Sequence, residues 1–278
     1  MNIVPCMSIY TDICNSYILS HICPCRSNGA ETRHIKGKSF ESGTIIPSEN
    51  NRGWWTTIET ADLNKDGRPD FVVGNHGLNT FFKSGDRMYS GDIDGNGSLE
   101  QFFATKSGEN YFPVADRDEV LSQVPSLKKS ILYYHDFAKM TIPQIFGIKN
   151  PEYLEISELN SVLFLSEGEK FRKVSLPLQA RFAPVYALHI SDPDGDGIQD
   201  ILAGGNLFKV KPEFGRFDGS AGWFFKGKLE NGNYSLQNGI SLGISGQIRD
   251  IKEIRAEGKR YLFFAKHEDE LEIFEITN

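Results

Sequence analysis

The chain has 278 residues, of which 39% are hydrophobic and 24% are charged, and its formal net charge at pH 7 is −7. These values are typical of a globular protein that is long enough to bury a sizeable core. The negative charge argues against nucleic acid and against an anionic membrane surface as partners of the whole chain. No segment has the roughly 18 consecutive apolar residues of a spanning helix, so we expect the chain not to cross a membrane.

Residues 1–45 differ from the rest of the chain because they hold all of its cysteines: Cys6, Cys14, Cys23 and Cys25. The close pair Cys23 and Cys25 does not have the usual spacing of zinc ligands. No signal peptide is evident, since a basic n-region and a clean apolar h-region are both missing. We predict that residues 1–45 are poorly ordered and that residues 46–278 form the folded part.

Three stretches beyond this segment share one pattern: ADLNKDGRPDFVVGN (61–75), GDIDGNGSLEQFFAT (91–105) and SDPDGDGIQDILAGGN (191–206). Counted from the first acid, an oxygen-bearing side chain stands at positions 1, 3, 5 and 9, and glycine stands at position 6. We call residues 62–70, 92–100 and 192–200 the first, second and third loops. The oxygen-bearing residues are, loop by loop, Asp62, Asn64, Asp66 and Asp70; Asp92, Asp94, Asn96 and Glu100; and Asp192, Asp194, Asp196 and Asp200.

This spacing suits calcium, a hard cation that takes six to eight oxygen ligands. Oxygens at positions 1, 3 and 5 of a tight loop can converge on one point, and glycine at position 6 lets the backbone turn sharply. A carboxylate at position 9 completes the ligand set, and the ion offsets the repulsion among the acids. The backbone carbonyl at position 7 adds a ligand whatever its side chain, and this position is held by Arg68, Ser98 and Ile198. A plain hairpin turn without metal is the alternative, and the threefold repetition favours the metal.

An EF-hand is excluded by the residue at position 12 and by the flanking sequence. That motif needs a bidentate glutamate at position 12 and a helix on each side, whereas position 12 here is Val73, Phe103 or Ala203. Flanking runs such as PVYALHI and ILAGG are short and apolar, and they are bounded by turn residues. They predict strands, so each loop is expected to join two strands.

A strand, an acidic loop of the form D-x-[DN]-x-[DN]-G-x-x-[DE] and an apolar strand that closes on Gly-Asn resemble the FG-GAP/VCBS repeat of integrin-α-like β-propellers. The resemblance covers about residues 50–275 and is closest in kind to bacterial surface proteins that often also carry an ASPIC/UnbV-type domain, of which we identify no part here. It implies an all-β propeller with structural Ca²⁺ in the three loops. We expect the third loop, with four carboxylates, to bind most tightly. The second loop, with Asn96 and Glu100, is expected to bind more weakly.

The spacing of the loops is uneven, with 30 residues from Asp62 to Asp92 and 100 from Asp92 to Asp192. Residues 115–149 have apolar residues at helical spacing and a capping signal at their start, and Pro125 interrupts them. We therefore predict two or three short helices there, as an insertion among four to five blade equivalents. The propeller is expected to be incomplete in this chain or to be part of a longer one.

These patterns predict a non-catalytic binding or scaffold module at the extracellular, periplasmic or outer-membrane surface of a bacterium, with an unidentified protein or glycan ligand. No catalytic residue is predicted, because the histidines have no metal or base spacing and familiar catalytic motifs are missing. The alternative is a propeller hydrolase or lyase that acts on polysaccharide, with Asp118 or His135 in its site. Trp54 and Trp55, read as strand residues, should face opposite sides, one in the core and one at the rim, where stacking on carbohydrate is the alternative role.

Overall fold

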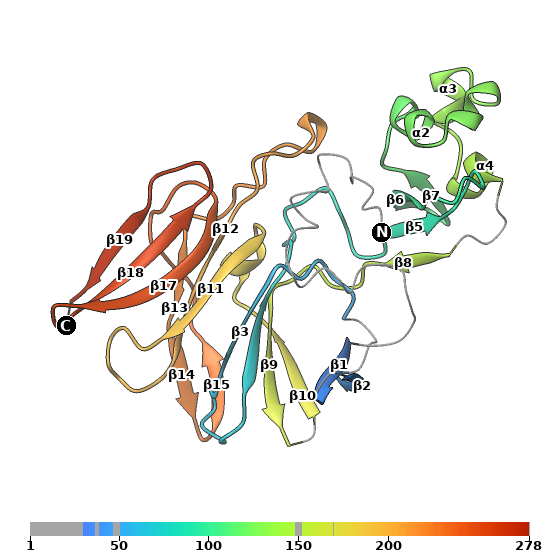
Figure 1. The fold of residues 1–278 in the computed structure, drawn as a ribbon. Coiled ribbons are helices and arrows are strands. Elements are labelled where there is room, and N and C mark those ends of the chain that lie inside the picture. The colour runs from blue at the N-terminus through green and yellow to red at the C-terminus, as the bar shows by residue number, and fades with distance from the viewer. Residues whose placement is uncertain (1–29, 37–38, 47–50, 148–151, 169, 278) are drawn as a thin grey trace. The chain divides into compact units, whose positions relative to one another are not determined.

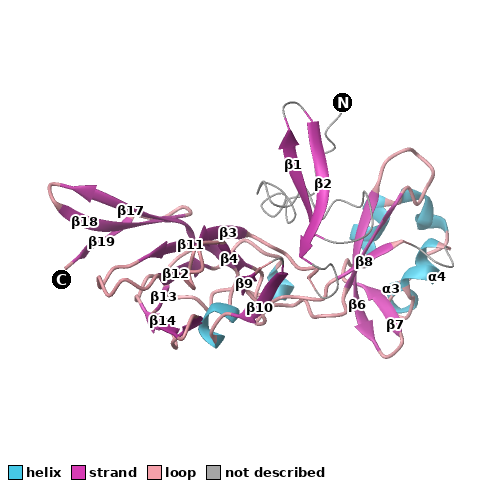
Figure 2. Ribbon diagram, turned by 90° about the horizontal axis from the view of Figure 1, so that it is seen from below, coloured by secondary structure: helices cyan, strands magenta, loops and turns pink. Residues whose placement is uncertain are grey.

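The computed structural model describes residues 30–36, 39–46, 51–147, 152–168 and 170–277. This part of the chain is mostly β, with several antiparallel sheets and few helices (Figures 1 and 2), so the predicted all-β class is confirmed. The chain divides into two compact units. Phe82–Glu158 form the smaller unit. The described residues up to Phe81 form the larger unit together with those from Leu159 onward.

Part of the segment predicted to be poorly ordered is described as a hairpin. Strands β1 (Ala30–Lys36) and β2 (Ser39–Ile46) pair antiparallel. Residues 1–29, which include the four cysteines, lie outside the described residues. No helix among the described residues combines the length and the apolar character that crossing a bilayer requires.

The first sheet of the larger unit is built from two stretches that are far apart in the sequence. Its order is β10-β9-β4-β3, with β3 at Thr57–Ala61, β4 at Asp70–Gly74, β9 at Val162–Glu167 and β10 at Lys170–Ser175. The chain leaves this sheet after β4, forms the smaller unit and returns at β9. This connection explains the short spacing between the first two loops, because the second loop belongs to the inserted unit and its own sheet.

Two further sheets of the larger unit follow in chain order. The second has the order β11-β12-β13-β16, and the third has the order β17-β18-β19. A separate hairpin pairs β14 with β15. The strands are β11 (Val185–Ser191), β12 (Asp200–Gly205), β13 (Trp223–Phe225), β14 (Gly227–Glu230), β15 (Asn233–Leu236), β16 (Ile240–Ser241), β17 (Ile248–Ala256), β18 (Lys259–Lys266) and β19 (Glu272–Ile276). The short 3-10 helices η3 (Leu178–Arg181) and η4 (Pro212–Phe214) lie in the connections.

The second sheet is packed on both faces. Successive side chains of a strand point to opposite faces, and in β12 Ile201 joins one apolar cluster while Leu202 joins another. The cluster of Ile201 includes Val72 and Leu163 of the first sheet, and the cluster of Leu202 includes Phe264 of the third sheet. Every residue of β12 is therefore buried, which accounts for its continuous apolar sequence.

The smaller unit has its own sheet and its own core. The sheet has the order β7-β6-β5-β8, with β5 at Arg87–Gly91, β6 at Glu100–Ser107, β7 at Asn110–Pro113 and β8 at Tyr153–Glu155. Short helices lie beside this sheet (Figure 1), where they bury Val120, Leu121 and Ile142 with Tyr89 and Phe102. They are α2 (Arg117–Gln123), η2 (Pro125–Lys129), α3 (Tyr134–Phe137) and α4 (Ile142–Phe146).

The start of α2 has the capping arrangement that the sequence predicts. The Asp116 carboxylate accepts a hydrogen bond from the backbone N–H of Glu119 at 2.8 Å, and the Glu119 carboxylate accepts one from the N–H of Asp116 at 3.0 Å. Pro125 begins η2 instead of continuing α2, because proline has no N–H to donate within a helix. The helical stretch is thus divided where the sequence indicates.

Candidate metal centres

Each acidic loop joins two adjacent antiparallel strands, so the predicted strand–loop–strand arrangement is confirmed. The loops connect β3 with β4, β5 with β6, and β11 with β12. In every case the last residue before the loop pairs with the residue at position 9, which begins the next strand: Ala61 with Asp70, Gly91 with Glu100, and Ser191 with Asp200. Position 9 is therefore held in the sheet and is buried, whereas the middle of each loop is exposed.

The same local hydrogen bonds shape all three loops. The aspartate at position 1 accepts the backbone N–H of the glycine at position 6, at 2.9, 3.0 and 2.8 Å in loop order. That glycine has φ of 83°, 86° and 79°, which is the left-handed region that favours glycine. The side chain at position 5 accepts the N–H of position 7, at 2.8, 2.7 and 2.8 Å. Sequence spacing alone therefore determines the turn.

The first two loops share a further contact, from the backbone of position 2 to the carboxylate at position 9. The N–H of Leu63 donates to Oδ2 of Asp70 at 2.8 Å, and the N–H of Ile93 donates to Oε2 of Glu100 at 2.7 Å. The other oxygen of Asp70 accepts the N–H of Ser166 at 2.7 Å. Because both oxygens of Asp70 have backbone donors, this buried carboxylate is satisfied without a cation.

The third loop lacks that contact because Pro193 stands at position 2 and proline has no N–H. Oδ1 of Asp200 accepts the N–H of Gly227 at 2.7 Å. Its Oδ2 is buried and has no hydrogen-bond partner in the described part of the chain. Burial, the larger cause, and the nearby charges of Asp194 and Asp196 raise the pKa of Asp200 to about 6. A buried acceptor without a partner costs free energy, and a bound cation would remove that cost.

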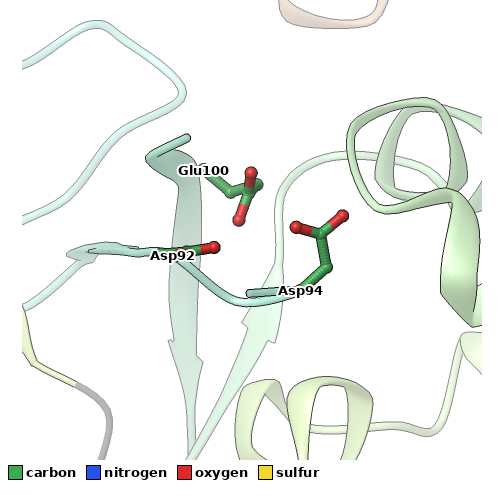
Figure 3. Close-up of side chains that lie close together, drawn as sticks. All are labelled: Asp92, Asp94 and Glu100. Carbon is green, nitrogen blue, oxygen red and sulfur yellow. The ribbon is translucent and has the colours of Figure 1, made fainter. Parts of the chain in front are cut away.

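Carboxylate oxygens gather in the second and third loops. One oxygen from each of Asp92, Asp94 and Glu100 lies within 4.8 Å of the others (Figure 3), and the same holds for Asp192, Asp194 and Asp200. Figure 3 shows that Asp92 and Asp94 come from the loop and Glu100 from β6, around one space. Two oxygens bound to one calcium at 2.3–2.6 Å can be at most about 5 Å apart. Both groups therefore fit one such ion.

The acids of the first loop do not form such a group within the described residues. Asp70 is engaged by backbone donors, and Nδ2 of Asn64 donates to Oδ2 of Asp66 at 3.3 Å. The first loop thus differs at position 3, where it has Asn64 in place of the aspartate that belongs to the group of three acids in each of the other two loops.

One residue of the third site has no counterpart in the sequence pattern. Nζ of Lys226 pairs with Oδ2 of Asp196 at 3.0 Å and also with Asp194. The hydrogen bond from Lys226 lowers the pKa of Asp194, and the two carboxylates raise the pKa of Lys226. Lys226 follows β13 and lies far from the loop in sequence, so no loop motif could have identified it.

The two residues named for the enzyme alternative, Asp118 and His135, each pair with a sequence neighbour. Asp118 pairs with Arg117 at 2.9 Å and accepts a hydrogen bond from the Tyr134 hydroxyl, whereas His135 pairs with its neighbour Asp136 at 2.8 Å. The side chains of Asp118 and His135 are both exposed.

One of the two tryptophans is buried and the other is half-buried, in line with the prediction, but neither lies on a strand. Both precede β3 instead of lying on a strand, because the backbone N–H of Trp54 donates to the Asn75 side chain and not to a neighbouring strand. Trp54 is buried, with its ring 4.8 Å from that of His76, so it offers no face to a sugar. Trp55 is half-buried, and its ring lies edge-on to that of Phe164.

Neither a protein-family model nor a curated protein matches this chain. Fold and site together therefore define it as a mostly β protein with two acidic loops that are suited to a metal ion.

Proposed function

We propose that the chain is a calcium-stabilised β-propeller module of FG-GAP/VCBS-like blades that serves as a non-catalytic binding or scaffold element at a cell surface. The observation that carries the calcium assignment is the buried Oδ2 of Asp200, which has no hydrogen-bond partner among the described residues and belongs to a carboxylate that converges with Asp192 and Asp194. Carboxylates and carbonyls are the ligands that calcium prefers. The ion would be held by the loop residues at positions 1, 3, 5, 7 and 9.

The arrangement of the larger unit supports the blade interpretation. Two of its sheets run as antiparallel meanders, β3-β4-β9-β10 and β11-β12-β13-β16. The first strand of the second sheet, β11, lies against both β3 and β17, the first strands of the neighbouring sheets. Radial repetition of sheets whose first strands adjoin is the plan of a propeller. In this proposal the smaller unit, with its own sheet and loop, is an inserted element, and a longer chain would supply further blades.

Calcium in this proposal is structural. Extracellular modules bind calcium with dissociation constants of about 0.1 to 1 mM, which suits the extracellular, periplasmic or outer-membrane surface inferred from the resemblance. A ligand that binds only the folded state adds about 2.7 kcal/mol of stability when its concentration is 100 times the dissociation constant. The partner of the module would be a protein or a glycan, and a hydrolase or lyase that acts on polysaccharide is the alternative.

Thermal unfolding of the full chain in EDTA and in millimolar calcium tests this proposal. We expect 1 mM calcium, at one to ten times the dissociation constant, to add about 0.4 to 1.4 kcal/mol and so to raise the melting temperature by about 1 to 6 °C, because 1 kcal/mol corresponds to roughly 2 to 4 °C for a chain of this size. Changing Asp192→Asn together with Asp194→Asn should reduce this rise. A matched control changes two exposed acids outside the loops, Asp118→Asn with Asp136→Asn, and should keep it. Equal melting temperatures with and without calcium would refute the proposal.

A further inference from the structure

The third loop carries a cation that belongs to the protein itself. Nζ of Lys226 lies 3.0 Å from Oδ2 of Asp196 and also pairs with Asp194. The residue after this lysine, Gly227, donates its N–H to Oδ1 of Asp200. The backbone that carries the lysine is thereby anchored to the same site, while the lysine side chain remains about one-third exposed, at 35%. The ammonium therefore lies at the accessible side of the carboxylate group.

The other two loops have no such group. In the first loop, the donor from the neighbouring strand to the carboxylate at position 9 is Ser166 of β9, and the residue before it is the buried Leu165. Leu165 is therefore the structural counterpart of Lys226, since each immediately precedes the residue that donates its N–H to the position-9 carboxylate from a neighbouring segment. Across the described ranges, no lysine or arginine pairs with the acids of the first or second loop. The lysine is specific to the loop with four carboxylates.

The ammonium does not complete the site. It contacts Asp194 and Asp196 but leaves Oδ2 of Asp200 without a partner among the described residues. A divalent cation that used the convergent oxygens of Asp192, Asp194 and Asp200 would bring two positive charges against Nζ. Like charges at this distance repel each other strongly, and the flexible four-carbon stem of lysine lets the ammonium move out into solvent.

We infer that Lys226 is a tethered counter-cation, which holds the third loop together in the metal-free protein and is displaced from Asp194 and Asp196 when a divalent cation binds. This inference rests on the proposed calcium binding. The four carboxylates of the third loop led us to expect that it binds calcium most tightly. The role of Lys226 reverses this expectation, because calcium must break two ion pairs in the third loop and none in the second. The third loop is then the one that stays ordered without metal and takes up calcium at higher concentration.

Site-resolved chemical labelling of the wild-type chain tests the displacement directly. Lysine amines would be acetylated with acetic anhydride in EDTA and in saturating calcium chloride, and the rate at each lysine followed by mass spectrometry. We expect Lys226 to react about fivefold faster in calcium, which is the factor that corresponds to loss of an exposed ion pair. Lys228, which pairs with Glu230 at 2.7 Å outside the loop, should react equally in both conditions. An unchanged rate at Lys226 in a chain that calorimetry shows to bind calcium would overturn the inference.

Substitution provides the second test. Lys226→Met should lower the melting temperature in EDTA, and the difference from wild type should vanish in calcium. In a chain whose second loop is silenced by Asp92→Asn with Asp94→Asn, Lys226→Met should increase the calcium affinity about tenfold. Lys228→Met removes the same charge from the same hairpin and should change neither quantity, and Lys226→Arg, which keeps the charge, should remain close to wild type.

The outcomes separate the two proposals. If the wild-type chain binds no calcium in calorimetry, both the proposed function and the role of Lys226 are wrong. If calcium binds and stabilises the chain but the labelling rate at Lys226 is unchanged or Lys226→Met has no effect, only the role of Lys226 is wrong.

Discussion

Pro193 occupies the position from which a backbone N–H would reach Asp200, and the second oxygen of that buried carboxylate has no partner in the described part of the chain. The corresponding residues Leu63 and Ile93 donate to their carboxylates at 2.8 and 2.7 Å. A single proline thus distinguishes the loop whose position-9 carboxylate keeps a buried oxygen without a partner in the described part of the chain from the loops in which the backbone supplies a donor.

Replacing Pro193 by a residue with a backbone N–H should change both the stability of the metal-free protein and its affinity for calcium. We predict that Pro193→Ala stabilises the metal-free protein by about 1 kcal/mol, because a hydrogen bond to a charged group contributes about 1.5 to 3 kcal/mol and the loss of proline returns roughly 0.4 to 1 kcal/mol of chain entropy to the unfolded state. Calcium affinity should fall, since the ion no longer supplies the missing partner. Urea unfolding in EDTA and calorimetry measure the two effects. Pro212→Ala, at the start of η4, is the control, and a destabilised Pro193→Ala in EDTA would contradict the prediction.

Asp200 should make the metal-free protein less stable as pH rises. Its pKa of about 6 in the folded state lies above the value of about 3.9 in an unfolded chain. The stabilisation that this difference adds to the free energy of unfolding is therefore fully present below pH 4 and is lost as pH rises through 6. The loss amounts to up to about 3 kcal/mol. Asp200→Asn keeps an acceptor for Gly227 but does not titrate. In EDTA, the stability of wild type relative to Asp200→Asn should therefore fall between pH 4 and pH 7, and a difference that does not depend on pH would be the contrary result.

His76 should have the opposite pH dependence. Its ring lies between those of Trp54 and Phe217, at centroid distances of 4.8 and 5.1 Å, and burial lowers its pKa to about 3. Because the pKa is lower in the folded state, protonation favours unfolding. The free energy of unfolding is highest above pH 6.5 and falls by about 1.4 kcal/mol for each pH unit below it. Between pH 7 and pH 5 in urea, wild type should lose about 2 kcal/mol more than His76→Gln. A loss of stability that is the same in wild type and in His76→Gln would contradict the prediction.

Asp70 should be structural whether or not calcium is present. Its carboxylate accepts backbone hydrogen bonds from Leu63 and Ser166, so Asp70→Ala leaves two buried N–H groups without a partner. We predict a loss of about 3 to 5 kcal/mol in EDTA, since each buried donor left unpaired costs roughly 1 to 3 kcal/mol. Chemical unfolding in EDTA measures it. Asp66→Ala, at an exposed position of the same loop, should cost much less, and equal losses for the two variants would count against this role.

Local features of the chain could be predicted from sequence because short-range spacing determines them. The turn at Gly67, Gly97 and Gly197 is closed by hydrogen bonds that span five residues or fewer, and the cap at Asp116 spans three. The strands beside each loop likewise follow from short apolar runs. The acidic residues, the strand–loop–strand units and the divided helix were therefore all accessible without coordinates.

Only the tertiary structure decided what lies beside these loops. The pairing of β4 with β9 across an entire inserted unit, the burial of Trp54 and the approach of Lys226 to Asp194 all join residues distant in sequence. Such contacts depend on which strand becomes the neighbour in a sheet, and no local periodicity carries that information. Pro193 illustrates both sources of information. The sequence shows that this residue has no N–H to donate, but only the structure shows that the carboxylate of Asp200, which would accept it, is buried.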